Sequence, residues 1–493
     1  MAFPAQKGSY VKRTHGKRIA IVLAGASVAA GVALTAMPAT AGEQATAPSG
    51  AQGHTQLIVG YRPGSDAAQS EARLAEVTTG TARAASGDAT FQRRTATGAA
   101  VVDLGTADTR AVDAALAGFQ ADPDVEYAEV DQRLVAQAAA DDPEFGKQWD
   151  LTEPVAGMNV PGAWDAGNSG DGAVVAVLDT GYVGHSDVEP NIVPGYDMIS
   201  DPVVARDTDG RDADAGDEGD WAEAEGACGP DTPKTNSSWH GTHVAGTIAA
   251  AAGNGVGIAG IAHDARIQPV RVLGRCGGLT SDIADGIIWA SGGEVDGLPV
   301  NPTPAKVINM SLGGAGVCNV TTQKAIDGAV SRGTSVVVAA GNSDLDAQLF
   351  TPANCANVIT VASSNRVGDR AFYSNWGAPV DLTAPGGQIR AETDAPGTVT
   401  TPQDGILSTV NAGETTPAEE GYKPMMGTSM AAPHVAGLAA LMIGKDSGLT
   451  PARVEELMKA GVRPLPGACE EGCGAGLADA AKTLEAVGGS ATG

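Results

Sequence analysis

The chain has 493 residues, 43% of them hydrophobic, which is ordinary for a globular protein and long enough for two or three domains. Its formal net charge of −27 argues against a nucleic-acid partner, because the phosphates would be repelled. Aromatic residues make up only 4% of the chain and there are 67 glycines, a composition that suits tightly packed α/β layers with many turns.

The first 41 residues have the pattern of a secretory signal. Basic residues precede the apolar stretch Ile19–Leu34, and Ala39-Thr40-Ala41 supplies small residues for cleavage. We expect cleavage after Ala41, a secreted, extracellular protein and no stable membrane association once the signal is removed. The apolar stretch is short for a membrane span, and a single-pass anchor is the alternative.

Residues 55–136 contain no cysteine and predict a small α+β domain. The expected elements are strand Gln56–Tyr61, helix Asp66–Val77, strands Phe91–Arg94 and Ala100–Leu104, helix Thr109–Phe119 and strand Tyr127–Leu134. The order β-α-β-β-α-β is that of a ferredoxin-like unit. A permanent binding domain is one interpretation of this region. The alanine-rich link Val135–Asp142 follows it.

From about residue 140 onward, strand-like apolar runs alternate with helical ones. The expected elements are Val174–Leu178, His243–Ala252, Arg266–Val272, Ser281–Ala290, Val307–Met310, Thr322–Ser331, Ser335–Ala340, Val358–Ala362, the helix Ala431–Ile443 and Pro451–Ala460. Such alternation predicts βαβ units and an α/β fold with a mostly parallel sheet flanked by helices. Polar groups from distant segments can then meet at one sheet edge.

Three blocks of this region carry residues suited to nucleophilic catalysis. The apolar run Ala173–Gly181 contains Asp179 where a buried strand should end, and Ser238–Thr247 places His240 before a small-residue helix. In Pro424–Gly437, Ser429 opens an apolar helix, whose unpaired N–H groups would stabilise a nearby oxyanion. Taken alone, Ser429 could equally be the N-cap of an ordinary core helix.

With these blocks in the order Asp, His, Ser, the chain resembles the subtilisin-like serine peptidases over roughly residues 145 to 480. A fourth block, Val336–Ser343, matches the family's oxyanion-hole segment and contributes Asn342. The resemblance implies that Ser429 attacks the peptide carbonyl while His240 moves its proton, oriented by Asp179. Asn342 and the Ser429 N–H would bind the oxyanion. The alternative is a catalytically silent subtilase-fold binding protein, which should lack at least one of these four residues.

The resemblance also implies a substrate-binding edge, where a polypeptide substrate pairs with the enzyme backbone as an added strand. Its residues are Ser311, Leu312, Gly313 and Gly314, facing Ala339, Ala340 and Gly341. Small residues here leave room for a large apolar side chain before the scissile bond.

In relatives of this kind the small domain is an intramolecular inhibitor and chaperone. The resemblance therefore implies a propeptide over residues 42–140 and a peptidase domain over 141–493, expected to be a monomer. The enzyme itself is expected to make the cut, in the link Val135–Asp142. A large parallel sheet has many non-local contacts and folds slowly, so a folding template that also blocks the site is physically reasonable.

All six cysteines lie in the predicted peptidase domain, and an even number in an exported protein suggests disulfides. Neighbours in sequence are the favoured partners: Cys228 with Cys276, Cys318 with Cys355, and Cys469 with Cys473. The middle pair would join the segment after Gly314 to the segment after Asn342. Zinc is the competing interpretation, but no cysteine or histidine pair has ligand spacing.

Two segments suggest calcium, and no organic cofactor is expected. Residues 207–214 carry Asp207, Asp209, Asp212 and Asp214 around a turn glycine, as a hard cation requires, with a solvated acidic loop as the alternative. A second site is implied by the resemblance alone. It would use Asp187 and the loop residues Asn254, Val256 and Ile258, with Gln148 as a further contributor.

Overall fold

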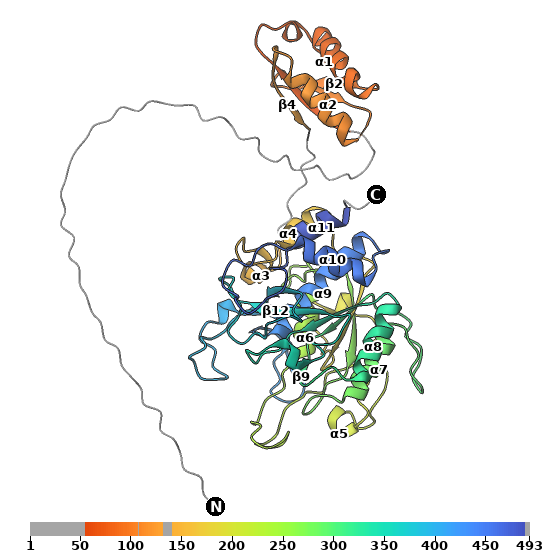
Figure 1. Cartoon of the computed structure of the whole chain (residues 1–493), viewed down its shortest axis with the longest axis vertical. Coiled ribbons are helices and arrows are strands. Elements are labelled where there is room, and N and C mark those ends of the chain that lie inside the picture. Colours follow the sequence, from red (N-terminus) through yellow and green to blue (C-terminus); the bar gives the residue numbers. More distant parts are fainter. Residues whose placement is uncertain (1–54, 107, 132–140, 489–493) are drawn as a thin grey trace, which may run out of the picture. The chain divides into compact units, whose positions relative to one another are not determined.

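The computed structural model describes residues 55–106, 108–131 and 141–488 (Figure 1). They belong to two compact units divided after Gln132, and each unit is described by itself. The predicted signal segment with its cut after Ala41 lies outside the described residues, as does the predicted link except Asp141 and Asp142. In the described ranges no helix has both the length and the apolarity that a membrane crossing needs.

The first unit is one antiparallel sheet with two helices. Its elements are β1 (Gln56–Tyr61), a 3₁₀ turn (Ala67–Gln69), α1 (Glu71–Ser86), β2 (Thr90–Arg94), β3 (Ala100–Asp103), α2 (Thr109–Gln120) and β4 (Val125–Val130). The strands lie in the order β2-β3-β1-β4. A buried cluster that includes Leu57, Val59 and Phe119 joins the sheet to α2.

Helix α1 begins and ends later than the sequence predicts, at Glu71 rather than Asp66 and at Ser86 rather than Val77. The Ser70 side chain accepts a hydrogen bond from the N–H of Arg73, so Ser70 is the N-cap. Strand β4 also differs from its prediction, and Leu134, where that prediction ended, lies outside the described residues.

The second unit is built on a seven-stranded sheet. Its helices and strands are α3 (Trp149–Thr152), α4 (Val160–Asp165), β5 (Val174–Asp179), β6 (Tyr196–Asp197), α5 (Pro202–Ala205), α6 (His240–Ala249), β7 (Arg266–Arg271), α7 (Thr280–Ala290), β8 (Val307–Met310), β9 (Gly314–Ala315), α8 (Val320–Ser331), β10 (Ser335–Ala339), β11 (Phe350–Thr351), β12 (Ile359–Ser364), β13 (Leu382–Pro385), β14 (Ile406–Asn411), β15 (Glu420–Met425), α9 (Thr428–Lys445), α10 (Pro451–Gly461) and α11 (Ala480–Gly488), with short 3₁₀ turns between them.

The large sheet has the strand order β13-β12-β10-β8-β5-β7-β6, and every neighbouring pair is parallel. This confirms the predicted mostly parallel sheet flanked by helices. Alternate residues of β5 enter different cores: Val175 and Val177 pack on the side of α6 and α9, and Ala176 and Leu178 on the side of α7 and α8. The sheet is therefore covered on both faces (Figure 1).

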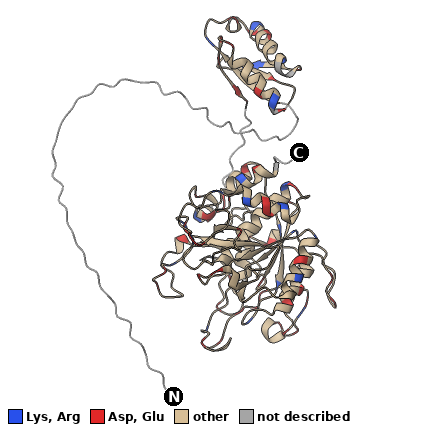
Figure 2. Ribbon diagram, in the orientation of Figure 1, with Lys and Arg blue, Asp and Glu red and all other residues tan. Residues whose placement is uncertain are grey.

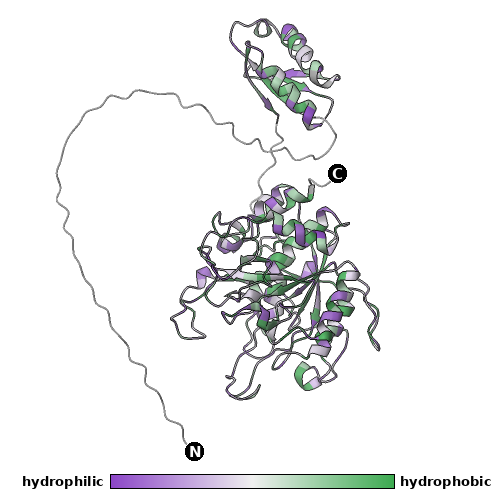
Figure 3. Cartoon of the chain, in the orientation of Figure 1, coloured by the Kyte–Doolittle hydropathy of each residue, from purple (hydrophilic) through white to green (hydrophobic). Residues whose placement is uncertain are grey.

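Helix α9 is the central helix of the unit. Every side chain from Thr428 to Ile443 is buried except that of Ser429, as expected for a helix that is apolar all round. In Figure 3 the strands of the sheet and α9 are predominantly green. Figure 2 shows charged residues on peripheral helices such as α7, α8 and α10.

Some elements escaped prediction. The hairpin β14–β15 and the short strands β6 and β13 have no clear periodic signal, and the predicted helix His243–Ala252 begins and ends three residues earlier, as α6. Trp239 has a left-handed conformation (φ 54°), so the helix starts at His240. Ala250 is extended at the C-terminal end, and the N–H of Ala251 donates to the Asp187 carbonyl instead of continuing the helix.

Three disulfides join the cysteines in the pairing favoured from sequence order: Cys228–Cys276, Cys318–Cys355 and Cys469–Cys473. No described cysteine is free.

Candidate active site

The candidate site lies at the carboxyl edge of the parallel sheet. Strand β5 ends at Asp179, Ser311 follows the end of β8, and Asn342 comes shortly after the end of β10. Because parallel strands present their carboxyl ends to the same edge, residues far apart in sequence meet there. Helix α9, which carries Ser429, packs against β8, β10 and α6.

Asp179 and His240 form a hydrogen-bonded pair. Asp179 is fully buried, and its Oδ1 accepts hydrogen bonds from His240 Nδ1 (2.8 Å) and from the N–H of Thr180 (2.8 Å). Close backbone contact makes this pairing possible, since a Cβ on Gly241 would lie 2.2 Å from the Gly181 carbonyl oxygen. The pairing sets Nδ1 of His240 as the donor and leaves Nε2 for proton transfer.

The environment raises the pKa of His240 above 6.5. Burial by itself lowers the pKa of this imidazole, but the charge of Asp179 and its hydrogen bond outweigh that effect. The His240 side chain is still 21% exposed, so the ring can reach a substrate.

Ser429 is the second residue of α9. Its Oγ donates to the carbonyl of Ser311 (3.1 Å), and the Ser311 Oγ donates in return to the Ser429 carbonyl (2.7 Å). That carbonyl is available because Pro433, four residues on, has no N–H to donate. Within residues 141–488, no hydrogen bond joins Ser429 to His240, and the Ser429 hydroxyl is directed at the Ser311 carbonyl instead.

Thr428 fixes the amide of Asn342. The Asn342 Oδ1 accepts hydrogen bonds from the N–H (2.8 Å) and the Oγ1 (2.9 Å) of Thr428, so Nδ2 is the group left to donate beside Ser429. The preceding Gly341 has φ +106°, and a Cβ there would lie 2.3 Å from Asn375 Nδ2. Thr428 was not predicted as a site residue, although it stands next to Ser429 in the Gly-Thr-Ser segment.

The predicted substrate-binding residues fall on two neighbouring segments. Gly314 belongs to β9, where it pairs with Thr351 of β11, and Leu312 is partly buried against the α7–α8 side of the core. Ala340 is fully buried in a small core cluster, so its methyl group does not line an open pocket. Ser311 is the member of the set that contacts Ser429.

At Asp187, where the sequence predicts a calcium site, three hydrogen-bond donors surround the carboxylate. The fully buried Asp187 carboxylate accepts hydrogen bonds from Asn254 Nδ2 (2.9 Å), the N–H of Ile258 (2.9 Å) and the Tyr422 hydroxyl (3.0 Å). A calcium ion needs oxygen lone pairs around it, whereas these three neighbours present hydrogens.

The remaining predicted ligands of that site are also engaged. The Oδ1 of Asn254 accepts from the N–H of Val256 (2.7 Å), and the Gln148 amide makes two hydrogen bonds to the backbone of Ala259. The side-chain oxygens of Asp187, Asn254 and Gln148 are therefore taken up by hydrogen bonds, and calcium is not proposed there.

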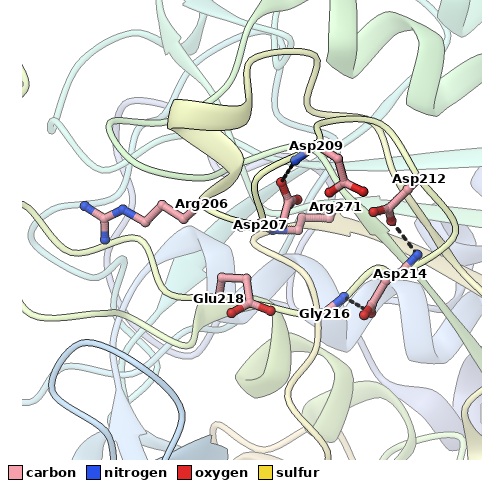
Figure 4. Close-up of a pocket in the computed structure, with 8 residues that line it drawn as sticks. All are labelled: Arg206, Asp207, Asp209, Asp212, Asp214, Gly216, Glu218 and Arg271. Atoms are coloured by element: carbon pink, nitrogen blue, oxygen red, sulfur yellow. Dashed lines mark hydrogen bonds and ion pairs between the residues drawn. The ribbon is translucent and has the colours of Figure 1, made fainter.

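The acidic loop does bring carboxylates together. One oxygen from each of Asp207, Asp209 and Asp212 lies within 4.8 Å of the others, and they line a cavity of about 270 Å³ (Figure 4). Asp214 also lines the cavity but is outside this group, and its Oδ1 accepts from the N–H of Gly216. Asp207 is shared with Arg271, whose Nη1 lies 3.1 Å away. Oxygen-only ligands near the surface fit a hard cation.

Two more histidines lie near the site but have partners of their own. His243 Nε2 donates to the carbonyl of Lys423 (3.0 Å), and burial lowers the pKa of His243 to about 3, so it stays neutral. His434 lies 3.0 Å from Asp150 through Nε2 and also contacts the Met430 carbonyl. Both hold α6 and α9 in the core, which leaves His240 as the imidazole beside the open edge.

The subtilase family model matches residues 170–476. The chain is 49% identical over 461 residues to an extracellular protease of Xanthomonas campestris pv. campestris, a match covering 91% of this chain and 76% of that protein. It is 40% identical over 449 residues to the extracellular basic protease of Dichelobacter nodosus, with 88% and 71% covered. A solved structure titled as proteases from Pseudoalteromonas arctica PAMC 21717 matches with a TM-score of 0.67 and 52% identity, over 71% of this chain and 99% of that one. The chain belongs to the subtilase family and is a serine endopeptidase.

Proposed function

We propose that Asp179, His240 and Ser429 form the catalytic triad of this peptidase. The observation that carries the proposal is the 2.8 Å hydrogen bond from His240 to the buried Asp179 at the sheet edge that α9 also reaches. His240 Nε2 takes the proton of Ser429 as Oγ bonds to the peptide carbonyl carbon. It returns that proton to the leaving amine, and a water then hydrolyses the acyl-enzyme by the same route.

The negative charge that develops on the carbonyl oxygen requires donors. Asn342 Nδ2 and the N–H of Ser429 supply them, since the Asn342 carbonyl oxygen is held by Thr428 and an N–H in the first turn has no partner within the helix. The polypeptide substrate pairs along Ser311–Gly314, opposite Ala339–Gly341. We expect a preference for a large apolar residue before the scissile bond.

The protein is made as a secreted precursor in this proposal. Residues 1–41 are the signal peptide, residues 42–140 are the propeptide with its inhibitory domain, and the remainder is a monomeric enzyme. The processing cut should precede Asp142. The Asp142 side chain is buried and accepts hydrogen bonds from the N–H groups of Gly253 (2.9 Å) and Asn254 (3.1 Å). A cut on the C-terminal side of Asp142 would separate it from the enzyme and remove these hydrogen bonds.

Calcium is the proposed structural ion. Asp207, Asp209 and Asp212 would hold it, and it would neutralise the mutual repulsion of their carboxylates. No step of peptide hydrolysis involves this ion.

The test compares the purified full-length precursor with its Ser429→Ala variant by intact mass. The wild type should lose residues up to about 140 and hydrolyse a peptide substrate, whereas Ser429→Ala should stay full length until a trace of mature wild-type enzyme is added. Ser447→Ala, in an exposed turn after α9, is the matched control and should process normally. Equal shortening of wild type and Ser429→Ala would assign processing to another protease. An intact wild type without peptidase activity would favour the catalytically silent alternative.

A further inference from the structure

Two carboxylates that the proposed mechanism does not use belong to a short segment, residues 216–222, near His240. Asp217 is only 2% exposed, and Asp220 is partly buried. A carboxylate in such a place requires hydrogen-bond donors, because burial of an unpaired charge is strongly unfavourable. The donors of both residues lead to the start of α6, the helix that begins at His240.

Asp217 binds this helix start through a hydroxyl. The N–H of Gly241 donates to Thr180 Oγ1 (3.0 Å), and that hydroxyl donates to Asp217 Oδ2 (2.6 Å). The N–H of Gly219 holds the other oxygen, Oδ1, at 2.9 Å. Since Thr180 directly follows Asp179, this relay ties the end of β5 to the beginning of α6.

Asp220 makes a parallel connection one residue earlier. The N–H of His240 donates to Ser238 Oγ (3.3 Å), and that hydroxyl donates to Asp220 Oδ2 (2.8 Å). The N–H of Ser238 also donates to Asp220 Oδ1 (2.6 Å). The N–H groups of two successive residues are therefore each held by a hydroxyl that a carboxylate holds in turn.

The first N–H groups of a helix have no partner inside the helix. In α6 the residue before the helix, Trp239, gives no side-chain cap, so the hydroxyls of Ser238 and Thr180 take that role. A hydroxyl that donates to a carboxylate is polarised and becomes a stronger acceptor for the N–H behind it. The two relays thus restrain both peptide groups that carry the imidazole.

We infer that Asp217 and Asp220 are positioning residues for the reaction, each holding the backbone at His240 through one hydroxyl so that the imidazole lies in line between Asp179 and Ser429. The inference rests on the proposed role of His240 as the base.

The charges of the two residues act in the same direction. Burial lowers the pKa of His240. The negative charges of Asp179, Asp220 and Asp217 all raise it. The pKa of Asp217 itself is raised to about 7, because burial outweighs the hydrogen bonds from Thr180 and the N–H of Gly219, which lower it. Loss of either carboxylate should therefore move the acid limb of the pH profile to lower pH, which a purely structural role would not do.

The test uses the processed enzyme, with kcat and KM expressed per active site titrated by the acylation burst at Ser429. Thr180→Val keeps both charges and breaks one relay, and we expect kcat to fall about 10- to 100-fold with little change in KM. Asp217→Asn should give a similar loss together with the acid shift of the pH profile, and the double variant should be no worse than the worse single one. Thr180→Ser should restore wild-type kcat.

Asp220→Asn with Ser238→Ala repeats the test on the second relay if the first set fails to fold. Glu225→Gln is the matched control, since it removes an exposed carboxylate of the same acidic region that contacts neither hydroxyl. Unchanged kcat in Thr180→Val and Asp220→Asn, with only a lower melting temperature, would overturn the inference. A wild type that does not hydrolyse peptides would instead refute the proposed function.

Discussion

Calcium removal should destabilise the second unit through the loop that carries Asp207, Asp209 and Asp212, and it should leave the hydrogen bonds of Asp187 untouched. The perturbation is a chelator, applied to the wild type and to Asp209→Asn. The second comparison is Tyr422→Phe, which removes the hydroxyl that donates to Asp187 at 3.0 Å.

The sizes of the two effects follow from their chemistry. A site built from a few surface carboxylates should resemble extracellular calcium modules, with a Kd of about 10⁻⁴ M. Calcium at roughly 100 times that Kd stabilises the folded state by about 2.7 kcal/mol, and its removal should lower the melting temperature by about 5 °C. Loss of the Tyr422 hydrogen bond to a buried carboxylate should lower the free energy of unfolding by about 1.5–3 kcal/mol, with or without calcium.

The assay is thermal unfolding of processed enzyme whose Ser429 has been blocked by a sulfonyl fluoride, so that self-digestion does not distort the transition. Asp209→Asn should lose the response to chelator, whereas Tyr422→Phe should melt lower and keep the full response. Glu225→Gln, an exposed carboxylate downstream in the same acidic region, should behave like the wild type. A chelator response that survives in Asp209→Asn but disappears in Tyr422→Phe would place calcium at Asp187 and refute the argument from donor hydrogens.

Three further predictions concern the site and its support. The acid limb of kcat/KM should lie above pH 6.5, since His240 must be neutral to accept a proton and its pKa is raised. Asp179→Asn should move this limb to lower pH and reduce kcat by about 10⁴-fold. A limb that does not move would contradict the pairing of Asp179 with His240. Thr428→Val should lower kcat about tenfold with KM unchanged, because one donor to the Asn342 carbonyl oxygen is lost, and kinetics of the Thr428→Ser control should match the wild type. Replacing both cysteines of the Cys318–Cys355 pair by serine should lower the free energy of unfolding in urea by about 4 kcal/mol, because this disulfide closes a separation of 37 residues. The same replacement at Cys469–Cys473, with a separation of 4, should lower it by about 2 kcal/mol. Equal losses would contradict the argument from loop entropy.

The sequence predicts best where one physical signal dominates. The apolar run before Asp179 gives β5 to within one residue, and Val307–Met310 is strand β8 as predicted, because strands buried on both faces are continuous apolar segments. Helix ends are less well predicted. A left-handed residue such as Trp239, or a capping side chain such as Ser70, sets the boundary, and neither changes the periodicity.

The hydrogen-bond partners of a candidate site residue are harder to predict from sequence than the residue itself. The sequence identifies Asp187 as an acid near a glycine-rich loop. Only the structure reveals that Asn254, Ile258 and Tyr422 donate hydrogen bonds to its carboxylate. Tyr422 comes from the hairpin β14–β15, far along the chain, where no local pattern indicates a contact. Asp217 was missed for the same reason, since its role depends on a hydroxyl contributed by another segment.

The order of elements along the chain also has a consequence for when activity can arise during synthesis. Asp179 ends the first strand of the large sheet, whereas Ser429 lies on α9, after the last strand of that sheet has been made. In the proposed mechanism, a chain that ends before α9 contains the acid and the imidazole but lacks the serine hydroxyl. If the proposed triad is correct, the ability to cut peptides therefore arises only after α9 has been made, and a chain that ends before α9 is inactive.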